Sequence, residues 1–310
     1  MSDTTLKVSN VVKTFDKVKA VDGVSFDVRR GTITGLLGRN GAGKTTTIRM
    51  ITGILLPDSG SIESPLGGNG QRFRDRVGYL PEERGLYKQM RILDHLLFLG
   101  ELKQCRGARA RVAAERWLRR FELWEKRDAK VEELSKGNQQ KVQIAAALLH
   151  DPELIILDEP QSGLDPVNMI LVRDLLRELK REGKTILLST HMMGEAEKLA
   201  DEIVVIHGGR TVLSGTVDEV RASSGRKTLQ IEFDGDGAFL GNLPHVGTAK
   251  LTNRSAELTL AEGGHSQDIL HAAAAKLYIR RFEMAIPSLE DIFVEKVGGQ
   301  TLARAASEAN

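Results

Sequence analysis

The sequence Gly38-Arg39-Asn40-Gly41-Ala42-Gly43-Lys44-Thr45 decides the fold, because its glycines and lysine have the spacing G-x-x-x-x-G-K-T. The largely apolar residues 31–37 before it predict a buried strand, and residues 46–51 after it predict the first turns of a helix. Glycines allow a tight turn whose backbone N–H groups converge on phosphate oxygens, and the helix N-terminus adds positive potential there. The stretch therefore predicts a phosphate-binding loop between a strand and a helix.

Side chains in this loop are candidate ligands for a nucleoside triphosphate and its Mg²⁺ ion. Lys44 would reach the β- and γ-phosphates, and the Thr45 hydroxyl would bind the metal. The candidate nucleotide-binding residues of the loop are Gly38, Asn40, Gly41, Gly43, Lys44, Thr45 and Thr46.

Composition narrows the class of protein. The chain has 310 residues, a net charge of +2 and 41% hydrophobic residues, which is enough apolar material for a real core. The near balance of charge gives no case for a nucleic-acid-binding surface, and a single cysteine, Cys105, excludes internal disulfides. No apolar run approaches the roughly 18–20 residues of a membrane span. We expect a cytoplasmic protein with no nucleic-acid partner, whose membrane connection runs through another polypeptide.

The order of apolar patterns predicts an α/β domain with an inserted helical block. Alternating residues 6–15 and 18–28 predict two antiparallel strands, and residues 77–81, 154–157, 185–189, 202–206 and 210–213 predict further strands. Helices are expected at 167–182 and 194–200. Between Arg91 and His150 the spacing is helical, with apolar faces formed by Leu93, Leu96, Leu97 and Gly100 and then by Val112, Trp117, Leu118, Phe121 and Leu123.

A second, smaller unit is expected after a linker at Ser223-Ser224-Gly225. Strands at 229–233, 257–260 and 278–285, a helix at 269–277 and a last helix capped by Ser288 predict an α+β domain. We therefore divide the chain into residues 1–222, with a helical subdomain at about 88–150, residues 226–299, and a flexible tail at 300–310.

Two carboxylates follow the apolar strand Leu154-Ile155-Ile156-Leu157. Asp158 would hold Mg²⁺, and Glu159 would polarise the water that attacks the γ-phosphate. The alternative is a strand that runs into an acidic turn. His191 follows the strand at 186–189, which should lie in the same sheet, so it would donate a hydrogen bond near the γ-phosphate; the alternative is a structural histidine.

The segment Leu134-Ser135-Lys136-Gly137-Asn138-Gln139-Gln140-Lys141, about twenty residues before Asp158, resembles the signature motif Leu-Ser-Gly-Gly-Gln of ATP-binding subunits of ABC (ATP-binding cassette) transporters. This resemblance implies an α/β P-loop NTPase cassette with a RecA-like parallel sheet, an antiparallel β subdomain and an inserted helical subdomain. It also implies that Ser135, Gly137 and Asn138 meet the γ-phosphate held by the opposite subunit. Without the resemblance, Ser135 would be an ordinary helix N-cap.

Three further positions match the family or depart from it. Phe15 lies where an aromatic residue stacks on adenine, and a core phenylalanine is the alternative. Asp165 ends a segment that resembles the D-loop, Ser162-Gly163-Leu164-Asp165, and could instead cap a helix. Glu82 follows Leu80-Pro81, where the family usually has glutamine; its carboxylate could ligate Mg²⁺ together with Thr45 and Asp158, but it would repel the γ-phosphate.

Residues 81–87, and residues 287–293 near the C-terminus, resemble the branch that pairs with exporter-type permeases encoded separately. The resemblance implies an ATPase that uses ATP and Mg²⁺, acts as a homodimer, and binds integral permease subunits at the inner face of the cell membrane. A groove formed by residues 82–87 and the helical block would hold a short permease helix. One alternative is an ABC ATPase that acts on nucleic acid or ribosomes, and another is a regulatory nucleotide-binding module without catalysis.

Overall fold

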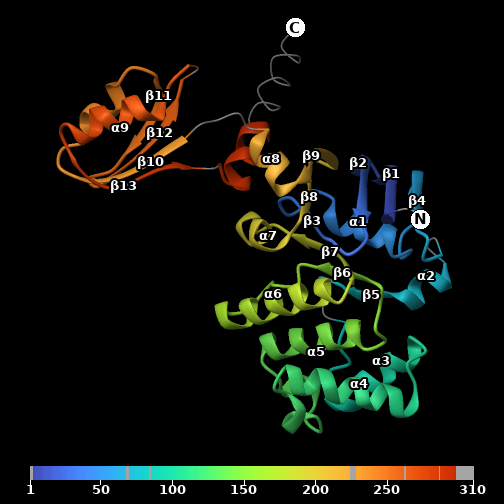
Figure 1. Ribbon diagram of the computed structural model, residues 1–310. Coiled ribbons are helices and arrows are strands. Elements are labelled where there is room, and N and C mark those ends of the chain that lie inside the picture. Colours follow the sequence, from blue (N-terminus) through green and yellow to red (C-terminus); the bar gives the residue numbers. More distant parts are fainter. Residues whose placement is uncertain are drawn as a thin grey trace. The chain divides into compact units, whose positions relative to one another are not determined.

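The computed structural model describes residues 3–67, 70–83, 85–223, 228–261, 263–285 and 287–297. The chain divides into two compact units, Met1–Val217 and Asp218–Asn310, which Figure 1 shows. The domain boundaries expected from the sequence stay a prediction, and most of the expected linker and the whole tail at 300–310 lie outside the described residues.

The first unit is built around a six-stranded sheet with the order β5-β6-β7-β3-β8-β9. Neighbouring strands are parallel from β5 to β8, and only β9 runs antiparallel to its neighbour. This arrangement confirms the predicted α/β class. The strands are β3 (Ile33–Leu37), β5 (Val77–Leu80), β6 (Leu154–Asp158), β7 (Thr185–Thr190), β8 (Glu202–His207) and β9 (Arg210–Thr216).

Strand β6 shows why the sequences of the central strands are unbroken runs of apolar residues. Every residue of β6 is buried, and successive side chains enter different cores because they point to opposite faces of the sheet. Ile155 and Leu157 belong to the core shared with the helical block. Leu154 and Ile156 belong to the core shared with the antiparallel sheet.

The antiparallel sheet has the order β2-β1-β4 and is formed by β1 (Thr4–Phe15), β2 (Val18–Arg29) and β4 (Ser59–Glu63). The pairing of β1 with β2 confirms the two antiparallel strands expected at the N-terminus. The register shifts where Gly23 adopts a φ of 77°, a backbone conformation that glycine tolerates best.

The inserted helical block contains α3, α4 and α5, which lie together in Figure 1. Leu93, Leu96 and Gly100 are buried as expected. Val112 was wrongly placed on the apolar face: it is 69% exposed, because the buried stripe of α4 runs through Ala110 and Ala114, two residues to either side. The block comprises α3 (Ile92–Leu102), α4 (Gly107–Arg120), the 3₁₀ turns η1 (Trp124–Lys126) and η2 (Val131–Glu133), and α5 (Lys136–Leu148).

The other helices of the first unit are α1 (Lys44–Ile51), α2 (Gln71–Arg76), α6 (Pro166–Arg181) and α7 (Met193–Leu199). Helices α6 and α7 confirm the expected pattern. Helix α2 was not predicted, because it has only six residues and a single buried one, Phe73, which defines no apolar face. In the described part of the chain, no helix is long and apolar enough to cross a bilayer.

The second unit contains an antiparallel sheet with the order β11-β12-β10-β13. Its core includes Ile231, Phe233, Leu258 and, from the helix α9, Ile269. The expected strands and helix are present, and β11 is an addition. The unit comprises α8 (Val217–Ala222), β10 (Thr228–Asp234), η3 (Ala238–Asn242), β11 (Val246–Leu251), β12 (Ser255–Leu260), α9 (Ser266–Ala274), β13 (Tyr278–Ala285) and helical residues 289–297.

Candidate active site

The loop between β3 and α1 forms one wall of a cavity of about 280 Å³. Gly43 is the N-cap of α1 and has a φ of 106°. A Cβ atom on Gly43 would lie 2.5 Å from the Ala20 carbonyl oxygen, so only glycine fits there. The cavity is lined by Phe15, Ala20, Asn40, Gly41, Ala42, Gly43, Lys44, Thr45, Thr46, Glu82 and Glu159. Gly38, at the start of the loop, has a φ of 158°.

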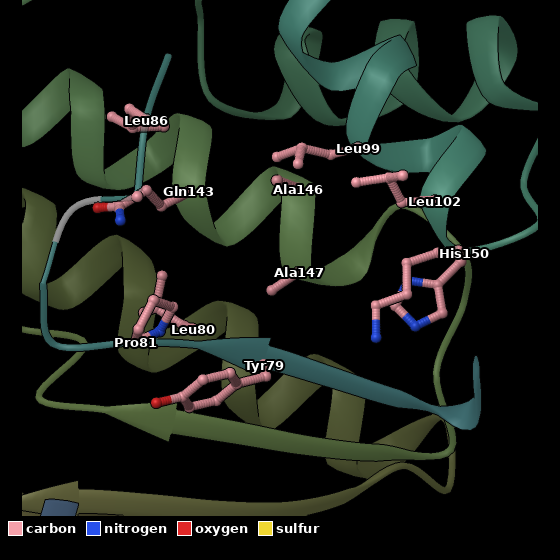
Figure 2. A pocket seen from close by; sticks show the side chains of 12 residues that line it. Tyr79, Leu80, Pro81, Leu86, Leu99, Leu102, Gln143, Ala146, Ala147 and His150 are labelled. Carbon is pink, nitrogen blue, oxygen red and sulfur yellow. The ribbon is translucent and has the colours of Figure 1, made fainter. Parts of the chain in front are cut away.

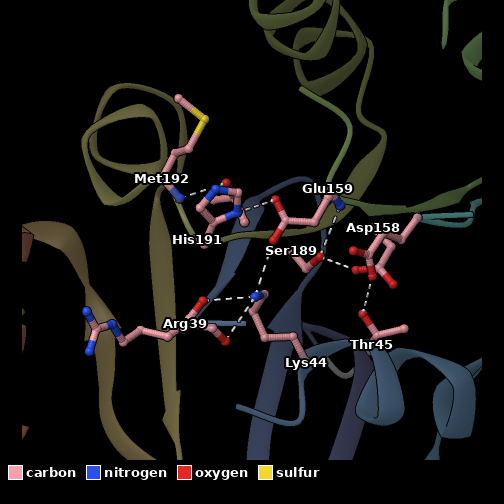
Figure 3. Close-up of polar contacts among 11 residues, drawn as sticks. Arg39, Lys44, Thr45, Asp158, Glu159, Ser189, His191 and Met192 are labelled. Carbon is pink, nitrogen blue, oxygen red and sulfur yellow. Dashed lines mark hydrogen bonds and ion pairs between the residues drawn. The ribbon is translucent and has the colours of Figure 1, made fainter. Parts of the chain in front are cut away.

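Lys44 is only 5% exposed, although it carries a charge. Its Nζ donates a hydrogen bond to the Gly38 carbonyl oxygen at 2.8 Å and lies 3.2 Å from Glu159 Oε1, as Figure 3 shows. A buried ammonium group requires such partners, because its isolated charge would be expensive to remove from water. The lysine is therefore held within the cavity, between the loop and the end of β6.

Glu159 follows β6 directly and connects three elements. Its backbone has a φ of 51°, in the left-handed region, and its N–H donates to Ser189 Oγ at 3.1 Å. Its side chain contacts Lys44 through Oε1 and lies 3.0 Å from His191 Nδ1 through Oε2. The side chain is 8% exposed, whereas that of His191 is 47% exposed. The structure thus brings together the three residues for which the sequence predicted chemistry at the γ-phosphate.

Asp158 is fully buried at the end of β6. Ser189 Oγ donates a hydrogen bond to Asp158 Oδ1, whereas Oδ2 has no hydrogen-bond partner among the described residues. Burial raises the pKa of Asp158, and the hydrogen bond with Ser189 opposes this shift. A buried carboxylate oxygen without a donor fits a cation, because the cation would compensate its negative charge.

Thr45 and Glu82 flank the same position. Thr45 Oγ1 donates a hydrogen bond to Glu82 Oε2 at 3.1 Å. No group of three or more histidine, cysteine, aspartate or glutamate side chains in the described ranges could hold a metal ion. A metal site here would therefore combine a hydroxyl with two carboxylates, all oxygen ligands of the kind that Mg²⁺ prefers.

A second group of predicted site residues does not line the cavity. Ser135 is exposed and caps α5, and its Oγ accepts a hydrogen bond from the Asn138 N–H at 3.4 Å. Asp165 caps α6 and accepts from the Asn168 N–H at 3.0 Å. A Cβ atom on Gly137 would lie 3.6 Å from Asn168 Nδ2, so the starts of α5 and α6 lie close together. Both helix-cap interpretations therefore describe real local contacts.

Phe15 lies at the mouth of the cavity and is 44% exposed, so it is not a core residue.

Sequence reasoning missed two contacts of the site. Ser189 connects Asp158 with Glu159, and Gln140 Nε2 donates to the Pro160 carbonyl oxygen at 3.1 Å. A polar residue near the end of an apolar strand was the only signal for Ser189.

Comparisons with known proteins assign this chain to a family. Residues 21–162 match the family model described as ABC transporter, and residues 215–297 match the C-terminal domain of DrrA1-3-like ATP-binding proteins. The uncharacterized ABC transporter ATP-binding protein YhaQ of Bacillus subtilis is 44% identical over 293 residues, which is 94% of this chain and 98% of that protein. The chain belongs to the family of ABC transporter ATP-binding proteins.

Two further similarities bear on the class of transporter. The Nod factor export ATP-binding protein I of Ralstonia nicotianae is 40% identical over 218 residues, which is 69% of this chain and 68% of that protein. A solved structure of the ATP-binding subunit of an ABC transporter is 34% identical, with a TM-score of 0.67, and the match covers 72% of this chain and 94% of that one. The fold is that of an ABC cassette, and these similarities favour transport over an action on nucleic acid or ribosomes.

Proposed function

We propose that this subunit hydrolyses ATP and that Glu159 is the general base. The proposal is supported by the position of Glu159 in the cavity, where its side chain contacts the buried Lys44 and the half-exposed His191. A base must be oriented toward the attacking water, and contacts on both carboxylate oxygens fix the orientation of this side chain. Glu159 would accept a proton from water, and His191 would hold the carboxylate and donate toward the γ-phosphate.

The loop residues would bind the triphosphate. Gly38, Asn40, Gly41 and Gly43 precede α1, and Lys44, Thr45 and Thr46 form its first turn, where backbone N–H groups and the helix dipole favour anions. Lys44 would exchange its contact with the Gly38 carbonyl oxygen for the β- and γ-phosphates. Phe15, half-exposed at the mouth of the cavity, would stack on the adenine.

Thr45, Asp158 and Glu82 would hold Mg²⁺. The orphaned Asp158 Oδ2 and the contact between Thr45 and Glu82 support this assignment. When bound, the metal would neutralise charge on the phosphate oxygens.

The active form would be a homodimer in which each cavity is completed by the other chain. Ser135, Gly137, Asn138 and Asp165 lie outside the cavity of their own chain, and Ser135 is exposed at the start of α5. A helix start offers unpaired N–H groups to an anion. Closure of two chains around two triphosphates would make hydrolysis dependent on pairing.

The partner in the membrane would be a permease that docks in a groove beside the helical block. A cavity of about 160 Å³ lies between the end of β5, the loop after it, and the helices α3 and α5. Figure 2 shows the side chains that line it. Leu86, Leu99 and Leu102 give it an apolar wall, and Ala146 and Ala147 leave room for a guest side chain. A short helix of the permease would fit this chemistry. Through it the subunit would lie at the inner face of the membrane and drive export.

The substitution Glu159→Gln tests the central assignment. The variant keeps the shape of the side chain but loses the base, so it should bind ATP, turn it over at less than about one hundredth of the wild-type rate, and accumulate as an ATP-bound dimer. Phosphate release measures the rate, and sedimentation with ATP measures the dimer. Wild-type turnover in this variant would remove Glu159 from the role of base.

A further inference from the structure

Glu82 adds a third carboxylate to those of Asp158 and Glu159 near a cavity whose glycine-rich loop and helix N-terminus favour a polyanion. It lines the cavity together with Lys44, Thr45 and Glu159, and its side chain is exposed rather than tied into the core. Its Oε2 accepts a hydrogen bond from the Thr45 hydroxyl at 3.1 Å. This position faces the place where the proposed triphosphate would lie.

The side-chain charges around the cavity do not favour a naked triphosphate. Lys44 is a buried cation of the lining, and Glu159, 3.2 Å from its Nζ, offsets its charge. Asp158 and Glu82 remain as two carboxylates, and Asp158 Oδ2 has no hydrogen-bond donor within the described residues. Like charges that lie close together repel, so a metal-free nucleotide would meet repulsion from the exposed Glu82 as well as from the buried Asp158.

We infer that Glu82 makes nucleotide binding conditional on a divalent cation, so that the subunit selects metal-loaded over metal-free ATP. Without a cation, the two carboxylates repel the phosphates. With one, the carboxylates and the Thr45 hydroxyl would serve as its ligands, and its positive charge would offset theirs. A neutral side chain at this position would hold the metal more weakly, and it would no longer penalise a nucleotide that arrives without one. The inference rests on the proposed ATP binding and adds a selectivity that this binding does not require.

The test compares the wild-type chain with Glu82→Gln by calorimetric titration with ATP, once with excess Mg²⁺ and once with EDTA. We expect the ratio of the dissociation constant in EDTA to that in Mg²⁺ to fall by about tenfold or more in Glu82→Gln, mainly because metal-free ATP binds more tightly. Glu82→Asp keeps the charge and should stay within about threefold of the wild-type ratio. The matched control Glu63→Gln removes one charge from the exposed strand β4, outside the cavity, and should also leave the ratio unchanged.

A second readout needs no nucleotide. Mn²⁺ added to the nucleotide-free chain loses its free electron paramagnetic resonance signal when it binds, and Glu82→Gln should weaken this binding by about tenfold. If the wild type and Glu82→Gln both bind ATP with the same ratio of dissociation constants, the role of Glu82 is overturned, but the proposed function is not. Equal Mn²⁺ binding would overturn it as well. Failure of the wild type to bind ATP even with Mg²⁺ would refute the proposed function and this inference together.

Discussion

Replacing His150 with glutamine should remove part of the acid sensitivity of the first unit. His150 is 8% exposed, and its Nε2 lies 3.2 Å from the Val77 carbonyl oxygen. Burial, followed by the positive charge of Lys103, lowers the pKa of His150 from 6.5 to about 4. Between these values the unfolded chain binds a proton that the native chain does not. The free energy of unfolding is therefore highest above the pKa of the unfolded histidine, and it falls as the pH decreases from 6.5 to about 4.

The size of the effect follows from the two pKa values. At pH 5 the unfolded histidine is almost fully protonated and the native one is mostly neutral, so unfolding becomes about 2 kcal/mol more favourable than at pH 7. A glutamine amide can donate to the Val77 carbonyl oxygen but does not titrate. We expect the wild type to lose about 2 kcal/mol more than His150→Gln between pH 7 and pH 5. Some pH dependence should persist, because burial also lowers the pKa of His95.

Urea unfolding followed by tryptophan fluorescence measures this difference. Trp117 and Trp124 are the two tryptophans of the chain, and both lie in the helical block of the unit that contains His150. His271→Gln is the matched control: it removes an exposed histidine from the second unit and should leave the pH dependence of the fluorescence transition unchanged. A His150→Gln variant that loses stability as steeply as the wild type would refute the reasoning.

Three further substitutions separate the parts of the site. Lys44→Ala should weaken Mg-ATP binding by about one hundredfold, because it removes the buried ammonium group from the cavity; unchanged affinity in a titration would contradict the loop assignment. Gly43→Ala should abolish nucleotide binding and cost at least about 2 kcal/mol in urea unfolding, because its Cβ would collide with the Ala20 carbonyl oxygen. Ser135→Ala should leave nucleotide affinity intact at low protein concentration but lower turnover at high concentration by about tenfold; equal turnover would remove Ser135 from the shared site.

The elements that carry the site were predictable because their signals are local. The glycine-rich loop fixes a strand and a helix around Lys44, and the buried residues of β6 form an unbroken apolar run before Asp158. Elements without such patterns were missed. Strand β11 has five exposed residues out of six and forms through pairing with β12 rather than through its own periodicity. The prediction that Val112 is buried was wrong because one apolar residue among alanines does not define which face of α4 is buried.

The contacts that orient the site were not predictable, because they join residues far apart in the sequence. Ser189 and Asp158 are separated by 31 positions, and only the parallel pairing of β6 with β7 brings them together. The same pairing places the turn after β7, with His191, beside Glu159. A sequence identifies the groups at the ends of two strands, but the register between the strands decides which of their atoms meet.

The two groups of site residues are joined by one helix. Helix α5 begins after Ser135, and Gln140 of this helix donates to the carbonyl oxygen of Pro160, the residue after Glu159. Farther along, α5 packs so closely on β5 that a Cβ atom on Gly78 would lie 2.3 Å from the Ala147 carbonyl oxygen. Strand β5 leads to Glu82, and Ala147 also lines the groove in Figure 2. Because a helix of 13 residues moves largely as a rigid rod, a force applied at its exposed N-terminus would reach the loop of Glu159, the strand before Glu82 and the wall of the groove together.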